Sequence, residues 1–433
     1  MNNPHENTHA AGAKKSTLLM LVSGFPALSE TFVVQEAMSL SEKFTLRTVS
    51  TEREPDASTG NYDLGGLNVS YRETTLTELT RVIFAFLRNP IAFFQSLLLL
   101  RHYYPWKRTF SRLYGLARLS AETRASGATL VHAHWRGPTD IAYLQARFMK
   151  VPFTIFVHAH DIYDEGLKEV PYKRLFAEKM RAAETVFTCT KQNLDTLKEL
   201  FPSTNIQLTY HGVNLEKLSK KTRPKRRADV PLRLLSVGRI IAYKGFDKVI
   251  DVATRLHASN IDFQWTIIGD GAYRSTLEKE VIAHGFKDRI HVRGPAPHKD
   301  VLTAMHNSDL FVFLGRHEQG QYGLPNVLIE AAANGLGIVT TPLPTISELI
   351  EHEVSGFVEE SPEACAGRIA RLAGSPNEIH AVGLRVRIFA RQHHDHHHQI
   401  QLMATKLAAL IPSSADAKKG ASKNAQAGTL EAA

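Results

Sequence analysis

Cysteine is nearly absent from this sequence of 433 residues. Cys189 and Cys365 are the only two, too few for a disulfide framework or for a zinc site made of cysteines alone. We therefore expect a reducing compartment. The first 15 residues are polar where a signal peptide would have its apolar stretch, so we expect a disordered lead-in there and not an export signal.

Long apolar runs are also missing. No uninterrupted run approaches the roughly 20 residues that cross a bilayer as a helix. The nearest candidate, residues 82–110, is broken at Pro90 and mixes aromatic and aliphatic side chains with Arg101, Lys107 and Arg108. This mixture is typical of a helix at a membrane interface, although a pair of buried helices packed on a sheet explains it equally well.

Negative charge is in short supply. Lys and Arg number 52 against 43 Asp and Glu, which gives a net charge of +9 and a pI of about 9.4. The excess favours anionic partners such as phosphates or an acidic membrane face. Seven basic residues fall between Lys217 and Arg227, where apolar side chains are almost absent, and this predicts a linker. We expect no nucleic-acid partner, because no aromatic platform or groove-reading motif accompanies the charge.

What the sequence does contain is a regular alternation of short apolar strands and amphipathic helices. This pattern predicts an α/β fold with parallel sheets covered on both faces. The linker divides it into two doubly wound, Rossmann-like domains that we expect to face each other across a cleft. The predicted boundaries are a lead-in at 1–15, a first domain at 16–212, the linker at 213–231, a second domain at 232–385, a C-terminal helix at 386–410 that crosses back to the first domain, and a disordered tail at 411–433.

A single acid stands out in the stretch 317–335. Residues 324–333 have the apolar spacing of a helix, with Pro325 suited to the first helical position and Gly335 to the stop. Glu330 lies on the face away from the core, and a solvated surface acid is the commonest reason for such a placement. Its face of the helix is shared by two more residues, Gly323 and Asn326.

Loops after predicted strands carry two cations and several glycines. Arg239 lies just past a strand and Lys244 opens the next helix, so together with that helix N-terminus they suit a diphosphate. The next strand ends in the tight turn "IIGDG" with Gly269. In the first half, the strand at 18–24 runs into a loop at Gly24.

Histidines end two strands of the first half. His132 and His134 fall on one face of the first strand, and His158 and His160 on one face of the second, followed by Asp161. These side chains and the run "HHDHHH" near the C-terminus are metal-ligand types, but nothing in the sequence fixes their convergence. We therefore expect hydrogen-bonding or acid/base roles for one or two of them and no metal.

These pieces, in this order, resemble the retaining nucleotide-sugar glycosyltransferases of family 4, which have the GT-B fold. The similarity runs from about residue 18 to residue 370 and is nearest to the bacterial exopolysaccharide and colanic-acid type. The stretches that carry it are "FPALSETFVVQEA", "HAHWRGPTDIAY", "HAHDIY", "YHGVN", "VGRIIAYKGFD", "IIGDG", "GLPNVLIEAAANGLGIVTT" and "SELIEHEVSGFV".

The resemblance implies roles for particular residues. Arg239 and Lys244 would hold the donor diphosphate without a metal or another cofactor, and Glu330 would bind the donor ribose. His158 would reach the transferred sugar. The first domain would then serve the acceptor and the second the nucleotide sugar. Further donor contacts are expected from Gly24, Gly269, Tyr322, Gly323, Leu324 and Asn326, and acceptor-side contacts from His134 and Asp161.

Two positions depart from the family pattern. Tyr322 stands where the family usually has a Glu close to the transferred sugar. Its hydroxyl takes over that contact, or Glu318 supplies the carboxylate, or the donor site is altered; a changed donor preference is favoured over an inactive protein. Residues 343–348 replace a usual Gly pair, and Pro344 lacks a backbone donor for phosphate.

The sequence thus predicts a retaining hexosyltransferase of the cytoplasm, peripheral at the inner face of a bacterial membrane. It would move a hexosyl unit from a nucleoside diphosphate sugar to a saccharide acceptor, lipid-linked, in exopolysaccharide or lipopolysaccharide synthesis. Two alternatives stay open: another GT-B enzyme, such as a sugar-nucleotide 2-epimerase or a sugar-phosphate synthase, and a non-catalytic binding protein in which Tyr322 marks a degraded donor site.

Overall fold

The computed structural model describes residues 15–26, 31–53, 64–73, 75–166, 172–218, 225–227, 229–316 and 323–411. Most of the predicted lead-in and tail, part of the linker, and both Glu318 and Tyr322 lie outside these residues.

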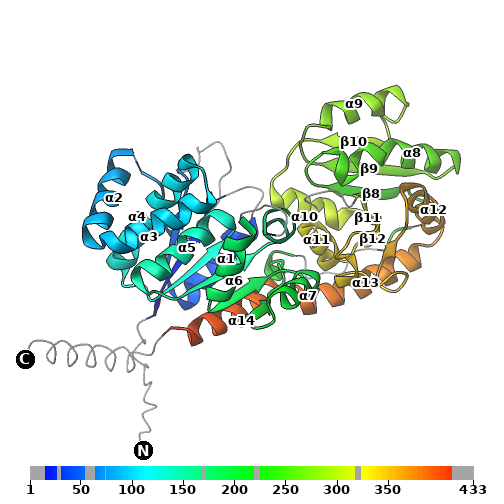
Figure 1. Cartoon of the computed structure of the whole chain (residues 1–433). Coiled ribbons are helices and arrows are strands. Elements are labelled where there is room, and N and C mark those ends of the chain that lie inside the picture. Colours follow the sequence, from blue (N-terminus) through cyan, green and yellow to red (C-terminus); the bar gives the residue numbers. More distant parts are fainter. Residues whose placement is uncertain are drawn as a thin grey trace, which may run out of the picture. The chain divides into compact units, whose positions relative to one another are not determined.

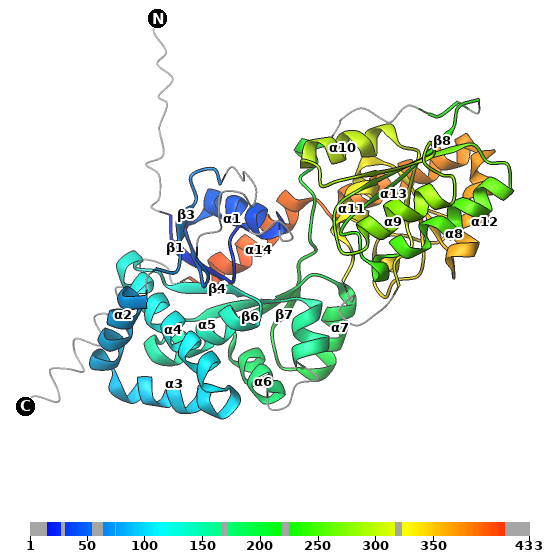
Figure 2. The same cartoon turned by 90° about the horizontal axis from the view of Figure 1, so that it is seen from above.

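The first half of the chain forms a seven-stranded parallel sheet in the order β3-β2-β1-β4-β5-β6-β7. Its central strands are buried because helices cover both faces (Figures 1 and 2). The strands are β1 (Thr17–Val22), β2 (Thr45–Ser50), β3 (Asn68–Ser70), β4 (Leu130–His134), β5 (Phe153–Val157), β6 (Thr185–Thr188) and β7 (Ile206–Leu208). The helices are α1 (Thr31–Lys43), α2 (Thr75–Arg88), α3 (Pro90–Tyr103), α4 (Trp106–Ser126), α5 (Arg136–Met149), α6 (Tyr172–Ala182) and α7 (Lys191–Leu200).

The second half forms a six-stranded parallel sheet in the order β10-β9-β8-β11-β12-β13. Two buried apolar clusters, one on each face, form its core. The strands are β8 (Leu232–Val237), β9 (Phe263–Ile268), β10 (Ile290–Arg293), β11 (Leu310–Phe313), β12 (Gly337–Thr340) and β13 (Phe357–Val358). The helices are α8 (Val249–Ala258), α9 (Arg274–Ala283), α10 (His298–Asn307), α11 (Asn326–Asn334), α12 (Pro362–Ala373) and α13 (Pro376–His393), followed by α14 (His396–Ala409).

Each sheet has a point at which the strand order reverses. In the first sheet the reversal lies between β1 and β4, and in the second between β8 and β11. Loops after the two strands at such a point diverge and leave room for a ligand at the carboxyl edge of the sheet. Gly24 follows β1, and Arg239 follows β8. The order of the strands therefore brings predicted site residues to the places where α/β sheets bind ligands.

Contacts between Cα atoms divide the chain into two compact units. One comprises Met1–Ile155, Ala182–Glu184 and the chain from Ala404, and the other comprises Phe156–Arg181 and Thr185–Met403. The last six residues of α14, from Ala404, thus belong with the beginning of the chain. This agrees with the predicted return of the C-terminal helix to the first domain, whereas the predicted domain boundaries stay predictions.

Helix α11 begins at Asn326, two residues after the start of the predicted range 324–333 and one after Pro325, the predicted first helical position. Pro325 has φ −63° and ψ 124°, so it is the residue before the helix and not its first helical residue. The ring fixes only φ, and its value suits both positions; ψ decides between them. The predicted stop is confirmed, because Gly335 is left-handed with φ 79°.

Residues 82–110 form the second half of α2, all of α3 and the start of α4. Both α2 and α3 pack against α4 while keeping large apolar side chains exposed, among them Phe84 (73%) and Ile91 (71%). The alternative of a buried helix pair is therefore wrong for this face. In the described part of the chain, no single helix combines the length and apolar composition of a bilayer span; α2 and α3 meet the criterion only as a pair bent by 117°.

Candidate functional site

The loop after β8 places two cations side by side. Lys244 ends a short 3-10 helix (Ala242–Lys244), and its side chain runs back over Gly238, where an added Cβ would lie 3.9 Å from Nζ. Desolvation, together with the positive charge of Arg239, lowers the pKa of Lys244 to about 8. A group in this state gains from an anion that replaces the lost water. The predicted pair is thus together in space, and among the described residues no carboxylate offsets the charge of Lys244.

Glycines hold the neighbouring loops against this pair. Gly269, at the end of β9, has φ 148°, and a Cβ on it would stand 1.9 Å from the carbonyl oxygen of Gly238. Gly245 has φ 84°, and its Cβ would stand 2.1 Å from the oxygen of Leu314. Side chains do not fit at either position. The sequence indicated a tight turn at Gly269, and the structure adds its contact with the cation loop.

Glu330 is less exposed to solvent than an ordinary acidic residue on a helix surface. Its side chain is 21% exposed, and Oε1 lies 3.1 Å from Nε2 of His298 at the start of α10. Asn334 donates to the Glu330 carbonyl at 2.9 Å and holds that turn of α11. The carboxylate therefore has a second polar group beside it. Nothing in the sequence linked His298 to Glu330, because the two are separated by 32 residues.

The loop after β11 brings another pair that the sequence did not indicate. Arg316 donates through Nη1 to both carboxylate oxygens of Asp247, at 3.0 and 2.8 Å. The backbone N–H of Arg316 also binds the carbonyl of Tyr243, next to Lys244, at 2.9 Å. The loop after β11 is thereby tied to the segment that carries Lys244.

The structure gives the positions of the other residues predicted to contact the donor, but it does not test the contacts themselves. Gly323 is exposed, while Leu324 and Asn326 are half-buried around the start of α11. Leu324 packs against a core cluster, as expected. Within 343–348, Leu343 and Ile346 are buried in the same cluster. The donor roles of Gly323, Leu324 and Asn326 stay predictions.

Gly24 and His134 belong to the first sheet. Gly24 follows β1, and a Cβ there would lie 3.0 Å from Oε2 of Glu52. His134 is fully buried, with Nε2 2.9 Å from Oε1 of Glu36; His132 lies 3.3 Å from the same oxygen. Burial alone would raise the pKa of Glu36, but the charge of His134 and hydrogen bonds from both histidines hold it well below its usual range. An acceptor contact by His134 stays a prediction, and here its imidazole is engaged by Glu36.

His158 directly follows β5 and is firmly supported. Its ring stacks on Phe156, with centroids 4.9 Å apart, and its side chain is nearly buried. Oδ2 of Asp161 accepts the backbone N–H of His158 at 2.9 Å. Asp161 is buried as well, at 4% exposure. It therefore fixes the backbone that carries His158.

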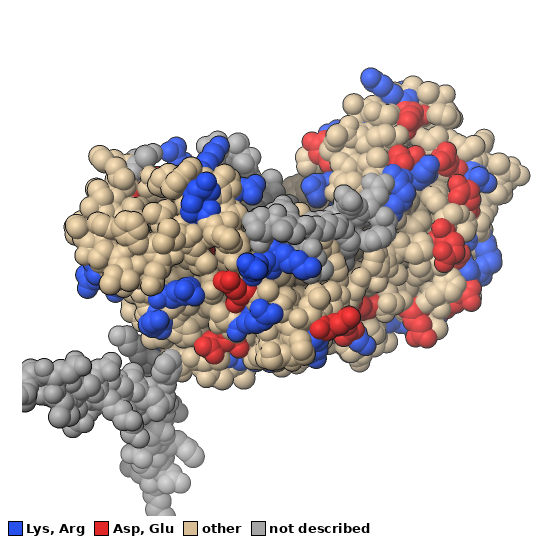
Figure 3. Space-filling view, viewed as in Figure 1, with Lys and Arg blue, Asp and Glu red and all other residues tan. Residues whose placement is uncertain are grey.

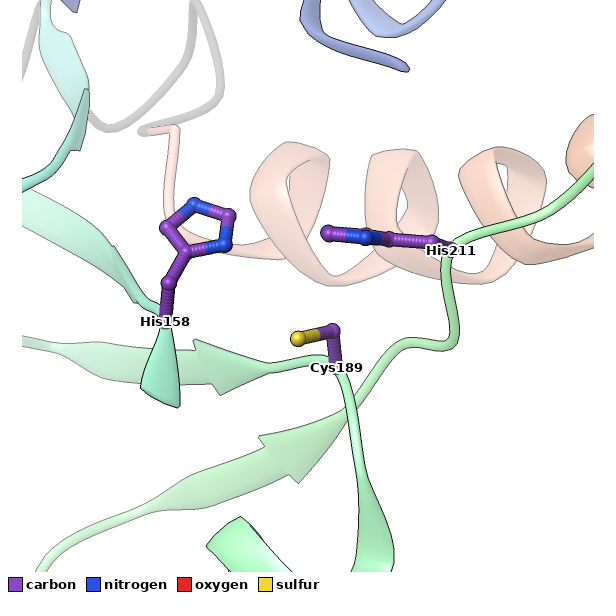
Figure 4. A group of neighbouring side chains, drawn as sticks. All are labelled: His158, Cys189 and His211. Atoms are coloured by element: carbon purple, nitrogen blue, oxygen red, sulfur yellow. The ribbon is translucent and has the colours of Figure 1, made fainter. Parts of the chain in front are cut away.

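Cys189 and His211 converge on His158. Cys189 follows β6, and His211 lies in the loop after β7 (Figure 4). The ring nitrogens and the thiol sulfur of the three residues all lie within 4.8 Å of one another. Desolvation, with the negative charges of Glu348 and Asp161, raises the pKa of the Cys189 thiol to about 12, so it is no nucleophile at neutral pH.

Two family models match consecutive parts of the chain. One, described as Glycosyltransferase Family 4, matches residues 81–217, and the other, Glycosyl transferases group 1, matches residues 219–387. Together they cover more than half of the chain. This chain belongs to glycosyltransferase family 4. The cation pair, Gly269 and Glu330 of this family 4 chain all lie within the second match, and His158 lies within the first.

Curated relatives of this family 4 member include enzymes of bacterial exopolysaccharides. It is 28% identical to the amylovoran biosynthesis glycosyltransferase AmsK of Erwinia amylovora, over 61% of this chain and 65% of the relative. It is 26% identical to the putative colanic acid biosynthesis glycosyltransferase WcaL of Escherichia coli, over 48% of this chain and 52% of the relative. The matches span less than two thirds of either relative.

Solved structures show the GT-B fold. A sucrose-phosphate synthase from Thermosynechococcus elongatus superposes with a TM-score of 0.69 at 15% identity, covering 92% of this chain and 99% of the other. Anabaena HepE in complex with UDP superposes with a TM-score of 0.68 at 16% identity, covering 91% and 100%. At such identities the likeness establishes the fold alone. The predicted fold class is confirmed.

Proposed function

We propose that this protein is a retaining hexosyltransferase that takes its sugar from a nucleoside diphosphate. The observation that carries the proposal is the pair Arg239 and Lys244 at the strand-order reversal of the second sheet. Lys244 is desolvated and its pKa is depressed, and in the part of the chain that the structure describes it has no counter-charge, which a diphosphate would supply. Solved HepE structures contain UDP or UDP-glucose, which supports a nucleotide-sugar donor here.

The chemistry then follows from charge placement. The bond between the anomeric carbon and the diphosphate oxygen breaks, and a bond from the acceptor hydroxyl oxygen to the anomeric carbon forms on the same face. Arg239 and Lys244 stabilise the negative charge that develops on the departing diphosphate, a role in which no metal or other cofactor is needed. A phosphate oxygen of the leaving group takes the proton of the acceptor hydroxyl.

The remaining residues position the donor. Glu330 accepts hydrogen bonds from the ribose hydroxyls, with His298 holding the carboxylate from its other side. His158 contacts the transferred sugar, and Asp161 positions His158 through its backbone. Tyr322 or Glu318 takes the contact usually made by the family's first Glu and sets the donor preference.

The acceptor in this proposal is a growing saccharide of an exopolysaccharide or lipopolysaccharide, linked to lipid. The enzymes of amylovoran and colanic acid synthesis among the relatives support the saccharide class. A lipid-linked acceptor requires that the enzyme reach a membrane from the cytoplasmic side, where the nucleotide sugars are. The helices α2, α3 and α4 carry a surface suited to this.

The apolar surface of α2–α4 is large and regular. Among the described residues, eleven of the eighteen exposed large hydrophobic side chains lie on these three helices. Leu76, Ile83 and Leu87 recur at helical spacing along α2, and Ile91, Phe94 and Leu98 along α3. The eleven are Leu76, Leu79, Ile83, Phe84, Phe86, Leu87, Ile91, Phe94, Leu98, Trp106 and Phe110.

The charge around this surface selects its partner. Residues 79–121 include no Asp or Glu but seven Arg or Lys. On the face that Figure 3 shows, the surface over α2 and α3 is largely uncharged, with basic side chains near its margin. Apolar side chains that enter the acyl boundary and cations that meet the headgroups match an anionic bilayer. Binding to a protein partner would not require this excess of positive over negative side chains.

Calorimetric titration with UDP and GDP tests the proposed donor site. Arg239→Ala and Lys244→Ala should each weaken binding about 10- to 100-fold, the range expected for lost hydrogen bonds between charged groups. Arg255→Ala removes an exposed cation of α8 and serves as the matched control. Nucleotide release from a panel of nucleoside diphosphate sugars then identifies the donor. If neither substitution changed the affinity for UDP or GDP, the proposed donor site would be wrong.

A further inference from the structure

Three adjacent parallel strands are each followed by a metal-ligand side chain. The order β5-β6-β7 places His158, Cys189 and His211 on neighbouring strands or the loops that follow them, at the same edge of the sheet. Their ligand atoms lie within 4.8 Å of one another, and Figure 4 shows the thiol and both imidazoles gathered around one point. The proposed transfer reaction uses His158 alone and leaves Cys189 and His211 without a part.

We infer that His158, Cys189 and His211 form a binding site for Zn²⁺. Two imidazole nitrogens and one thiolate are the ligand set that suits this ion, with a fourth position left to water. In tetrahedral geometry the three ligand atoms would stand about 3.5 Å apart. Each pair therefore has to close by no more than about 1.3 Å, which side-chain rotation supplies. On binding, the thiol gives its proton to solvent and the sulfur binds the ion as thiolate.

The surroundings of the three side chains support the site. The stack on Phe156 and the Asp161 contact fix His158, and Nδ1 of His394 lies 3.3 Å from the carbonyl oxygen of His211. Cys189 directly precedes Thr190, the N-cap of α7, so the start of a ten-residue helix holds the backbone beside it. Cys189 and His211 are half-buried, which leaves the ion a route to the site.

Occupation of this site would regulate the protein. A bound ion uses a nitrogen of His158 and turns that imidazole away from a sugar. Zn²⁺ is therefore an inhibitor of transfer, a consequence that rests on the proposed function, whereas the binding itself does not.

Cobalt spectroscopy tests binding without reference to activity. The untagged full chain is titrated with Co²⁺, and one equivalent should produce a thiolate-to-cobalt charge-transfer band and tetrahedral d–d bands that Zn²⁺ abolishes. The chain has only two cysteines, so Cys189→Ala should lose the charge-transfer band and Cys365→Ala should keep it. His211→Ala should weaken Zn²⁺ binding by more than the 10- to 100-fold loss typical of an outer partner, and the exposed His284→Ala should not.

The rate of sugar transfer is then measured with and without Zn²⁺ for each variant. The ratio of these two rates is compared, so a change in a variant's basal activity does not affect the result. Wild type and Cys365→Ala should be inhibited, and Cys189→Ala should need at least about tenfold more Zn²⁺ for the same inhibition. If Co²⁺ produced d–d absorption but no thiolate band, as binding to the histidines at 393–398 would, the proposed site at Cys189 would be wrong. Binding at Cys189 without inhibition overturns the regulatory role. A protein with no transferase activity still gives the cobalt result, so the two proposals fail separately.

Discussion

Lys244 lies beside Arg239, and desolvation together with that guanidinium charge lowers the pKa of Lys244 from 10.5 to about 8. A bound diphosphate favours the charged ammonium and raises this pKa again. Lys244 is charged in the free protein below pH 8, so affinity for UDP should be constant there. Above pH 8 binding requires uptake of a proton, and affinity should fall by up to tenfold per pH unit until the pKa of the complex is reached.

Calorimetry at pH 7 and pH 9 in buffers of different ionisation enthalpy measures this proton uptake directly. Lys244→Arg provides the matched control, since guanidinium stays charged throughout and should flatten the profile. Equal affinity at the two pH values in wild type, with no proton taken up, would contradict a diphosphate on Lys244.

Glu330 should matter for the nucleoside and not for the phosphates. Glu330→Gln should weaken UDP binding about tenfold or more, because ribose hydroxyls lose a charged acceptor, yet leave inorganic pyrophosphate binding unchanged. Glu360→Gln, an exposed acid on the same half of the chain, is the control. A loss that is equal for UDP and pyrophosphate would mean that Glu330 acts through the loops and not on the ribose.

Gly269 allows no side chain. A Cβ there would stand 1.9 Å from the carbonyl oxygen of Gly238, at a φ of 148°, so Gly269→Ala should lower the free energy of unfolding by about 3 kcal/mol or more. Gly367→Ala is the opposite case. Gly367 lies exposed inside α12 with nothing within 4 Å of an added Cβ, and alanine there should stabilise the helix by about 0.5–1 kcal/mol. Urea unfolding of both variants checks the pair, and equal effects of the two substitutions would contradict the tight loop contact.

Local features of this chain could be predicted, and long-range ones could not. Arg239 and Lys244 are five residues apart on one strand-loop-helix turn, so their proximity follows as soon as the preceding strand is predicted correctly. Gly335 as a helix stop is equally local. Glu330 with His298, and His134 with Glu36, join different elements across 32 and 98 residues. Their pairing depends on strand order and helix packing, which periodicity does not encode.

The cluster of His158, Cys189 and His211 shows the same limit. Each residue lies at or near a strand end that the sequence marks, but convergence requires β5, β6 and β7 to be neighbours in this order. The exposed faces of α2 and α3 show the same limit for side chains that stay outside the core. Their composition fitted a buried pair and an interfacial pair equally, and only packing against α4 decides which side chains stay outside.

The apolar face of α2 and α3 leads to a prediction for membrane binding. Phe84 and Leu87 are 73% and 68% exposed, and burying two such side chains in the acyl boundary contributes about 3–6 kcal/mol. The double substitution of Phe84→Ser and Leu87→Ser should therefore reduce cosedimentation with vesicles containing anionic lipid by at least about tenfold. Wild-type binding should weaken with added salt, since Arg88 and the other cations of this surface contribute.

Ile282→Ser is the matched control for that experiment. Ile282 is 65% exposed on α9, in the other half of the chain, so its loss should change neither vesicle binding nor UDP affinity. The double variant should also keep its UDP affinity, because α2 carries none of the proposed donor contacts. Vesicle binding that survives the double substitution, or that is equal for neutral and anionic vesicles, would contradict docking through this surface.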